Sequence, residues 1–133
     1  MDKLEYIPGD FISVYVGVKK YIVEVIGTEN ENEVLLYQIK FPNGEIQYAD
    51  KDNIVPIPLT PEILEKNGWK NDGYDWYKLP TKRAYLYITK DIITLGEFLV
   101  CVGLDRHNLA SINFVHQLQH ILFGLRLNSE MEV

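Results

Sequence analysis

The chain contains only one cysteine, Cys101, among 133 residues, which excludes a disulfide bond within it. Cys101 lies in the apolar run Phe-Leu-Val-Cys-Val at 98–102, and a cysteine in such surroundings usually packs as a small hydrophobic residue. A catalytic thiol would need a neighbouring base or cation, and no sequence motif provides one. We therefore expect Cys101 to be a buried core residue.

Long apolar segments are also missing. No run approaches the roughly 20 apolar residues that are needed to cross a bilayer. The start of the chain, Met-Asp-Lys-Leu-Glu-Tyr, lacks the apolar core of a signal peptide. We expect a cytoplasmic protein without a membrane partner.

Positive charge is scarce and scattered. The net charge is −6 and the pI is about 5.0, and the longest basic runs are Lys19-Lys20 and Lys82-Arg83. An acidic protein repels phosphate backbones, which disfavours nucleic acid as a partner. The proportions of hydrophobic residues (47%) and charged residues (24%) are typical of a folded globular protein.

Recognisable catalytic motifs are absent. The sequence contains no GxSxG, HExxH, CxxC or phosphate-binding loop pattern. The carboxylates Asp50 and Asp52 fall in a charged turn, where we expect solvated side chains instead of a catalytic pair. We predict no cofactor, and we favour a protein that is not an enzyme without excluding catalysis.

The first half of the chain has the pattern of short β-strands. Alternation and β-branched residues predict strands at 10–18, 21–28, 33–41 and 45–49, and a short one at 53–57. Turns are expected at Lys19-Lys20, at Glu29–Asn32 and at Pro42-Asn43-Gly44, where Asn-Gly is a strong hairpin signal. Five short strands with tight turns predict a small barrel that resembles SH3-like and Tudor-like folds over about residues 8–57.

A short helix is predicted at 61–67, where the second half begins. Thr60 is a suitable N-cap, Pro61 suits the first helical position, and Gly68 is a suitable residue just after the helix. Three antiparallel strands should follow at 74–79, 83–89 and 96–102, with a turn at 79–82 and a connection at 90–95.

A final helix is predicted at about 111–125. Its apolar arc should lie across the three-stranded sheet, and it comprises Phe114, Val115, Leu118, Ile121, Leu122 and Leu125. Gln117 and Gln119 flank Leu118, and we expect both to be surface glutamines. The predicted fold class is therefore α+β, with an SH3-like five-stranded small barrel at 1–58 and a helix–three-strand–helix unit at 59–133. Because each part is too small to bury much area alone, we expect them to share one core.

Two segments together resemble a family. The segment at 55–69, Val-Pro-Ile-Pro-Leu-Thr-Pro-Glu-Ile-Leu-Glu-Lys-Asn-Gly-Trp, is similar to "PIPLTxEILxKNGF", and 115–120, Val-His-Gln-Leu-Gln-His, is similar to "VHxLQN". Both belong to short uncharacterised proteins of Bacteroides-type gut bacteria and of their phages and mobile elements. Trp69 and His120 depart from this pattern. The resemblance implies a bacterial or phage-borne origin and no particular activity, ligand or catalytic residue.

His116 and His120 are the sharpest candidates for chemistry. They are four residues apart on the predicted final helix, so their imidazoles should leave the same face about one turn apart, as in some metal sites. A further ligand would have to come from elsewhere, such as His107, Asp105 or Glu97. The alternative is that His116 forms a structural hydrogen bond and His120 is solvated.

Aromatic residues are the main candidates for a binding surface. They gather at Tyr74, Trp76, Tyr85 and Tyr87, and alternation places Tyr85 and Tyr87 on one sheet face, away from Leu86 and Ile88. That face either packs between the two halves or is exposed to a partner. In the barrel, two arrangements are possible for Phe11, Tyr15, Tyr37 and Tyr48. They form either an aromatic cage for a cation or an ordinary core.

Three functional hypotheses follow. The leading one is a non-catalytic protein-interaction module of mobile-element or phage origin that binds another protein through barrel loops or exposed tyrosines. The second is a small metal-dependent hydrolase that uses His116 and His120. The third is a nucleic-acid-binding barrel. The oligomeric state stays open.

Overall fold

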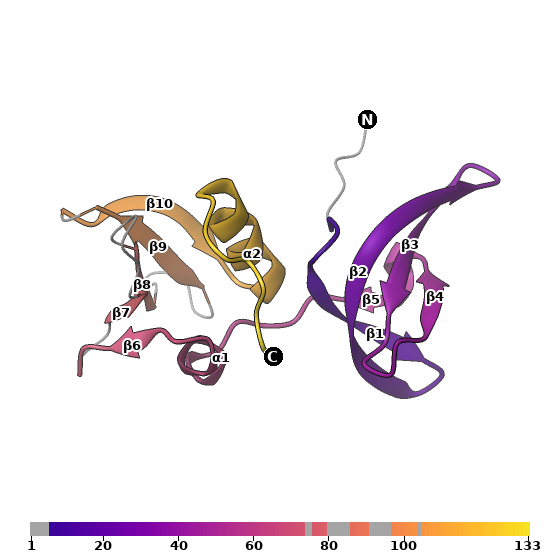
Figure 1. Ribbon diagram of the computed structural model, residues 1–133, viewed down its shortest axis with the longest axis horizontal. Helices are drawn as coiled ribbons and strands as arrows, with labels where there is room; N and C mark the ends of the chain where they lie inside the picture. The colour runs from indigo at the N-terminus through magenta and orange to yellow at the C-terminus, as the bar shows by residue number, and fades with distance from the viewer. Residues whose placement is uncertain (1–5, 74–75, 80–85, 91–96, 104) are drawn as a thin grey trace. The chain divides into compact units, whose positions relative to one another are not determined.

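The computed structural model describes residues 6–73, 76–79, 86–90, 97–103 and 105–133 (Figure 1). The fold is α+β: two five-stranded antiparallel sheets are combined with two short α-helices in this described part of the chain. The chain divides into two compact units. The first unit contains residues up to Ile57 together with Phe114–Met131, and the second contains Pro58–Asn113.

The first unit is built on a sheet of strand order β4-β3-β2-β1-β5. The strands are β1 (Phe11–Val16), β2 (Lys19–Glu31), β3 (Val34–Lys40), β4 (Ile46–Ala49) and β5 (Ile54–Val55). A 3₁₀ turn, η1 (Lys51–Asn53), precedes β5 and is capped by the Asp50 carboxylate, which accepts a hydrogen bond from the Asp52 N–H. The five predicted strands are present as an open sheet whose edge strands are β4 and β5.

Two predicted turns lie elsewhere. Lys19 and Lys20 belong to β2, and the chain turns instead at Gly17, whose φ of 65° is accessible to glycine at little cost. Residues 29–31 also belong to β2, and the next turn is at Asn32 and Glu33, with φ of 51° and 67°. Two consecutive positive φ values match the twist of antiparallel strands, so the ladder continues through residues that look like a polar loop.

The core of the first unit lies on one face of this sheet. Alternate residues of β1, β2 and β3 point into it, and Tyr6 packs edge-to-face on Tyr37 with ring centroids 5.4 Å apart. A register shift between Val25 and Gly27 places a bulge in the 13-residue β2, which bends the strand. The buried cluster comprises Tyr6, Ile12, Val14, Val23, Val25, Tyr37, Ile39, Phe41, Ala49 and Ile54.

The second unit begins with helix α1 (Pro61–Lys66), as predicted from local signals. The Thr60 Oγ1 accepts the Ile63 N–H at 3.2 Å. At the other end Gly68 has φ of 87°, and the N–H groups of Gly68 and Trp69 bond back to the carbonyls of Glu65 and Leu64. This pair of bonds is the Schellman arrangement, in which glycine takes the left-handed position.

The second sheet has the order β10-β9-β8-β7-β6, so it contains two more strands than the three that were predicted. Strands β7 (Trp76–Leu79), β8 (Leu86–Lys90) and β9 (Phe98–Val102) match it, and β6 (Lys70–Asn71) and β10 (His107–Ile112) are additional. Edge strand β10 lacks a clear apolar alternation and contains a bulge between Asn108 and Ala110, which explains why it was missed. Residues 80–82 of the predicted turn and 91–95 of the predicted connection lie outside the described residues.

Helix α2 (Val115–Gly124) starts four residues later than predicted because the chain up to Ile112 is strand. Its buried residues are Val115, His116, Leu118, Gln119 and Leu122, so burial extends beyond the predicted apolar arc. By its contacts α2 belongs to the first unit, whereas the sequence assigned all of 59–133 to the second. The physical reason is a set of polar contacts to β1 that hydrophobic periodicity does not reveal.

Candidate functional site

Polar side chains of α2 hold the start of β1. The Gln119 side chain is buried, with 2% of its surface exposed. Its Oε1 accepts the Phe11 N–H at 2.9 Å, and its Nε2 donates to the carbonyls of Gly9 (2.8 Å) and Ser129 (3.0 Å). The prediction of a surface glutamine at 119 was therefore wrong, because the amide satisfies three backbone groups that would otherwise be unpaired. Gln117 caps its own helix, with Oε1 accepting the Phe114 N–H at 3.1 Å.

Beside Gln119, His120 contacts a buried carboxylate. Its Nε2 lies 2.7 Å from Oδ2 of Asp10, an oxygen that also accepts the Ile7 N–H at 2.9 Å. The Asp10 side chain is 2% exposed and that of His120 is 33% exposed. Burial raises the pKa of Asp10, and the bonds from Ile7 and His120 partly offset this rise. The His120 ring is thus partly exposed, but its Nε2 cannot bind a metal without breaking this contact.

His116 is an aromatic core residue. It is 3% exposed, its ring is stacked on Phe114 at 6.0 Å, and it is tilted against Tyr6 at 4.9 Å between centroids. Burial lowers its pKa to about 4, and the proximity of His120 adds to this effect. Its Nδ1 has no hydrogen-bond partner among the described residues. The imidazole is therefore neutral at pH 7.

The histidine pair has little of what catalysis or metal binding requires. The two rings face edge-to-face with centroids 5.5 Å apart. Among the described residues no group of three histidine, cysteine or acidic side chains is placed to hold a metal ion. His107, the third histidine, begins β10 and is instead paired with Asp105 at 2.7 Å, with both side chains exposed. The cavity beside Asp10 and Gln119 has a volume of about 20 Å³, which is room for about one water molecule.

In the second unit an arginine covers Trp76 and Tyr87, the two described residues of the predicted aromatic surface. Tyr74 and Tyr85 lie outside the described residues. Trp76 and Tyr87 pack edge-to-face at 6.2 Å, and the guanidinium carbon of Arg106 lies 4.6 Å from each ring centroid. Tyr87 is 8% exposed. We call these three residues the Arg106 clamp. The cation that contacts these two aromatic rings is therefore a side chain of the protein itself.

Cys101 lies in β9 directly opposite Tyr87 and is buried, as expected, with 1% of its surface exposed. Its Sγ donates to Oδ1 of Asn108 at 3.2 Å. Burial raises the pKa of the thiol, and the nearby Arg106 offsets this only in part. A protonated, buried thiol is a poor nucleophile.

The aromatic cage considered for the barrel does not form. Tyr37 is in the core cluster and packs on Tyr6, whereas Phe11 alternates with the core residue Ile12 and faces the other side of the sheet. Tyr15 and Tyr48 are 45% and 50% exposed. Because Tyr37 lies on the core face and Phe11 on the other, the four rings do not share one face of the sheet.

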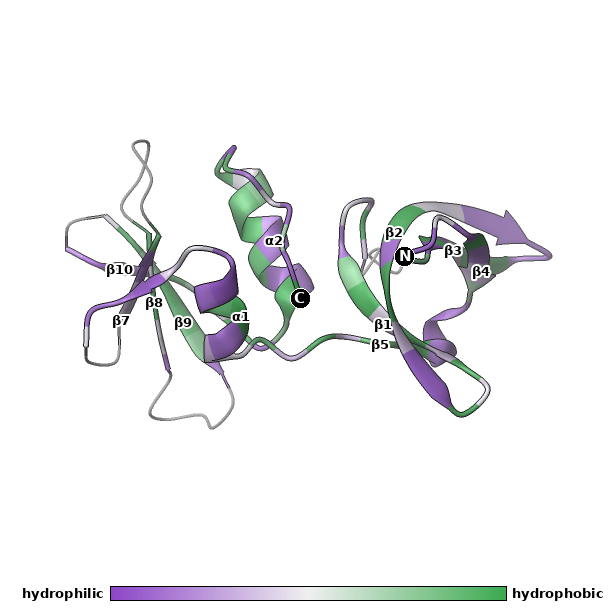
Figure 2. Cartoon of the chain, turned by 60° about the horizontal axis from the view of Figure 1, so that its bottom comes forward, coloured by the Kyte–Doolittle hydropathy of each residue, from purple (hydrophilic) through white to green (hydrophobic). Residues whose placement is uncertain are grey.

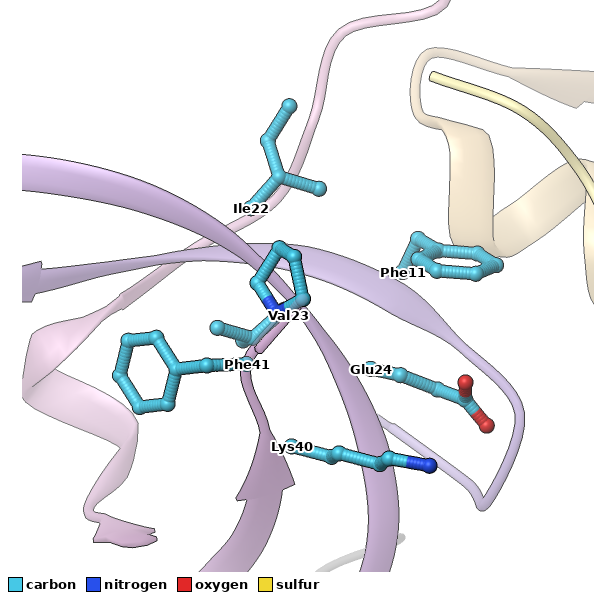
Figure 3. A pocket seen from close by; sticks show the side chains of 7 residues that line it. Phe11, Ile22, Val23, Glu24, Lys40 and Phe41 are labelled. Atoms are coloured by element: carbon cyan, nitrogen blue, oxygen red, sulfur yellow. The ribbon is translucent and has the colours of Figure 1, made fainter. Parts of the chain in front are cut away.

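The first unit has a pocket across β1, β2 and the end of β3, shown in Figure 3. Its volume is about 300 Å³, at the lower end of the range of ligand sites. Both apolar and charged side chains line it. We call it the β1–β3 pocket, and it is lined by Phe11, Ile22, Val23, Glu24, Lys40, Phe41 and Pro42.

The strands around this pocket are hydrophobic in their central parts and hydrophilic at the ends of β2, as Figure 2 shows. Ile22 is 43% exposed, although Val23 beside it is 1% exposed. Tyr21 packs edge-to-face on Phe41 at 5.7 Å and thereby fixes one wall of the pocket. The sequence signal that was missed is the alternation of Phe11 with Ile12 and of Ile22 with Val23, which leaves large apolar residues on both faces of the sheet.

No described helix has both the length and the apolar character that are needed to cross a membrane. Comparisons of the chain with protein-family models, with curated proteins and with solved structures find no match.

Proposed function

We propose that the chain is a non-catalytic interaction module that binds another protein through the β1–β3 pocket. The observation that carries the proposal is a pocket of about 300 Å³ whose wall includes Phe11, Ile22, Phe41 and Pro42. Exposed apolar surface with a formed concavity is typical of sites that accept a side chain of a partner. This proposal moves the binding surface from the predicted tyrosines to the first sheet.

The connectivity of the first unit supports an SH3-like small barrel as the finer description of its fold. Four strands follow one another as neighbours, and the fifth returns across η1 to pair with β1, with Ser13 opposite Val55. A long second strand with a bulge lets one strand take part in both curved halves of such a barrel. Folds of this kind carry many functions, so the pocket and not the fold supports the binding role.

A cytoplasmic role in a Bacteroides-type bacterium, its phages or its mobile elements remains part of the proposal. It rests on the two sequence segments at 55–69 and 115–120. The net charge of −6 favours a protein partner over nucleic acid. The metal-dependent hydrolase has less support, because His120 is engaged by Asp10 and His116 is buried.

Site-specific photo-crosslinking in a lysate of such a host tests the proposal. A photoreactive amino acid replaces Ile22, which lines the pocket, or Val34, which is at the far end of the β2–β3 ladder. The two positions are matched because they are 43% and 50% exposed and both lie in strands of the same sheet. We expect a defined protein adduct from position 22 that position 34 does not give. Equal labelling from both positions, or none from position 22, would contradict the proposal.

A further inference from the structure

A pair of opposite charges lines one side of the β1–β3 pocket. Glu24 and Lys40 are directly opposite each other in the β2–β3 register, and Phe11 is opposite Glu24 in the β1–β2 register. The three side chains therefore form a row across three strands on one face of the sheet. In Figure 3 the carboxylate and the ammonium group extend the same way from their strands.

These two charges are available to a ligand. No ion pair within 4.0 Å joins Glu24 to Lys40 or to another described residue. Lys40 is exposed and Glu24 is partly exposed, so both groups keep their hydration in the free protein. A partner that brings a cation to Glu24 and an anion to Lys40 gains selectivity and a faster association from these contacts.

The apolar part of the pocket limits the size of what it can hold. A volume of about 300 Å³ fits one large side chain with part of its backbone and not a folded element. Val23 and Phe41 belong to the buried core cluster, and Tyr21 packs on Phe41. Because these walls are already packed, binding requires little rearrangement.

We infer that the ligand is a short peptide segment of the partner, with one bulky apolar anchor side chain and, within a few positions of it, one acidic and one basic residue. The anchor contacts Phe11 and Ile22, which line the pocket on the same face of the sheet as Glu24 and Lys40. The acidic residue pairs with Lys40 and the basic residue pairs with Glu24. This inference rests on the proposed function and specifies the chemistry of the partner.

Selection from a displayed library of random dodecamer peptides on the immobilised full chain tests the inference. We expect the enriched peptides to share a large apolar residue with an acidic and a basic neighbour, and to lose binding at least tenfold to Ile22→Asp. Lys40→Glu should weaken the same peptides about tenfold and, in a new selection, replace the acidic preference by a basic one. Glu24→Lys with Lys40→Glu should reverse the charge pattern.

Lys19→Glu is the matched control, since it makes the same charge change at an exposed residue outside the pocket. It should leave the selected peptides bound within about twofold, and circular dichroism should show all variants folded. Peptides that depend on Ile22 but carry no charge pattern would overturn the inference and leave the proposed function in place. An absence of any peptide that depends on Ile22 would overturn both.

Discussion

Aromatic side chains line a surface in each unit, and the two surfaces differ in what covers them. In the second unit, Arg106 covers Trp76 and Tyr87 at 4.6 Å from each ring centroid. In the first unit, Phe11 and Phe41 line a pocket whose charged residues, Glu24 and Lys40, make no ion pair with a described residue. In the Arg106 clamp a cation of the chain itself covers the aromatic rings. In the β1–β3 pocket the charged residues make no such contact with a described residue.

The β1–β3 pocket depends on contacts that hold the start of β1 in place. The Gln119 side chain, which is 2% exposed, holds the start of β1 through three hydrogen bonds, one from the Phe11 N–H and one each to the carbonyls of Gly9 and Ser129. We expect Gln119→Ala to lower the free energy of unfolding by about 2–4 kcal/mol, because buried backbone groups lose their partners. Urea denaturation measures this change. The control Gln47→Ala, whose Nε2 bonds only Glu45 on the exposed surface, should cost less than about 0.5 kcal/mol.

A similar loss for both glutamine variants would mean that the contacts of Gln119 are not what fixes the start of β1. A loss for Gln119→Ala alone, accompanied by weaker peptide binding, would connect the helix contact to the shape of the pocket.

The first unit should also be the acid-sensitive one. The pKa of His116 is about 4 in the fold, below its ordinary 6.5, so the unfolded state binds a proton first as pH falls. The free energy of unfolding is therefore unaffected by protonation of His116 above pH 6.5, and it decreases by roughly 3 kcal/mol in total as pH falls toward 4. Burial raises the pKa of Asp10, so protonation of Asp10 acts in the opposite direction at the acid end.

Chemical denaturation of the wild type and of His116→Phe at several pH values between 7 and 4 measures this dependence. The variant keeps an aromatic ring beside Tyr6 and Phe114 and should lose most of the slope. An unchanged slope would assign the acid sensitivity to other groups.

The smallest expected effect is in the second unit. Arg106→Ala removes the cation from Trp76 and Tyr87 and should lower stability by about 1 kcal/mol. Alanine at φ of 54° retains the backbone strain of the original residue, so the difference reports the side chain. In a Trp69→Phe background, the fluorescence of Trp76 should shift to the red as its ring becomes more exposed. Arg106→Lys keeps the charge and should shift it less.

Local signals allowed the sequence to predict some elements closely. Thr60, Pro61 and Gly68 define α1 through contacts within a few residues. The strands of the first sheet followed from alternation in the same way. Cys101 was also predicted as buried, because its apolar neighbours are adjacent in sequence.

What the sequence could not reveal depends on contacts between distant residues. The hydrogen bond between Phe11 and Gln119 joins positions 108 residues apart, and the hydrophobic periodicity of the sequence does not predict it. Asp10 and His120 are likewise separated by 110 residues. The pocket was missed because Phe11, Glu24 and Lys40 come together only through the strand register.

Whether a partner binds at the β1–β3 pocket or on the second unit is best tested by comparing the two surfaces in one experiment. A photoreactive amino acid replaces Ile22, in the β1–β3 pocket, in one variant and Leu109 in the other. Leu109 is 47% exposed, lies on β10 and is three positions from Arg106. We expect a defined protein adduct from position 22 and none from position 109. A partner captured from position 109 but not from position 22 would contradict this expectation and place recognition on the second unit.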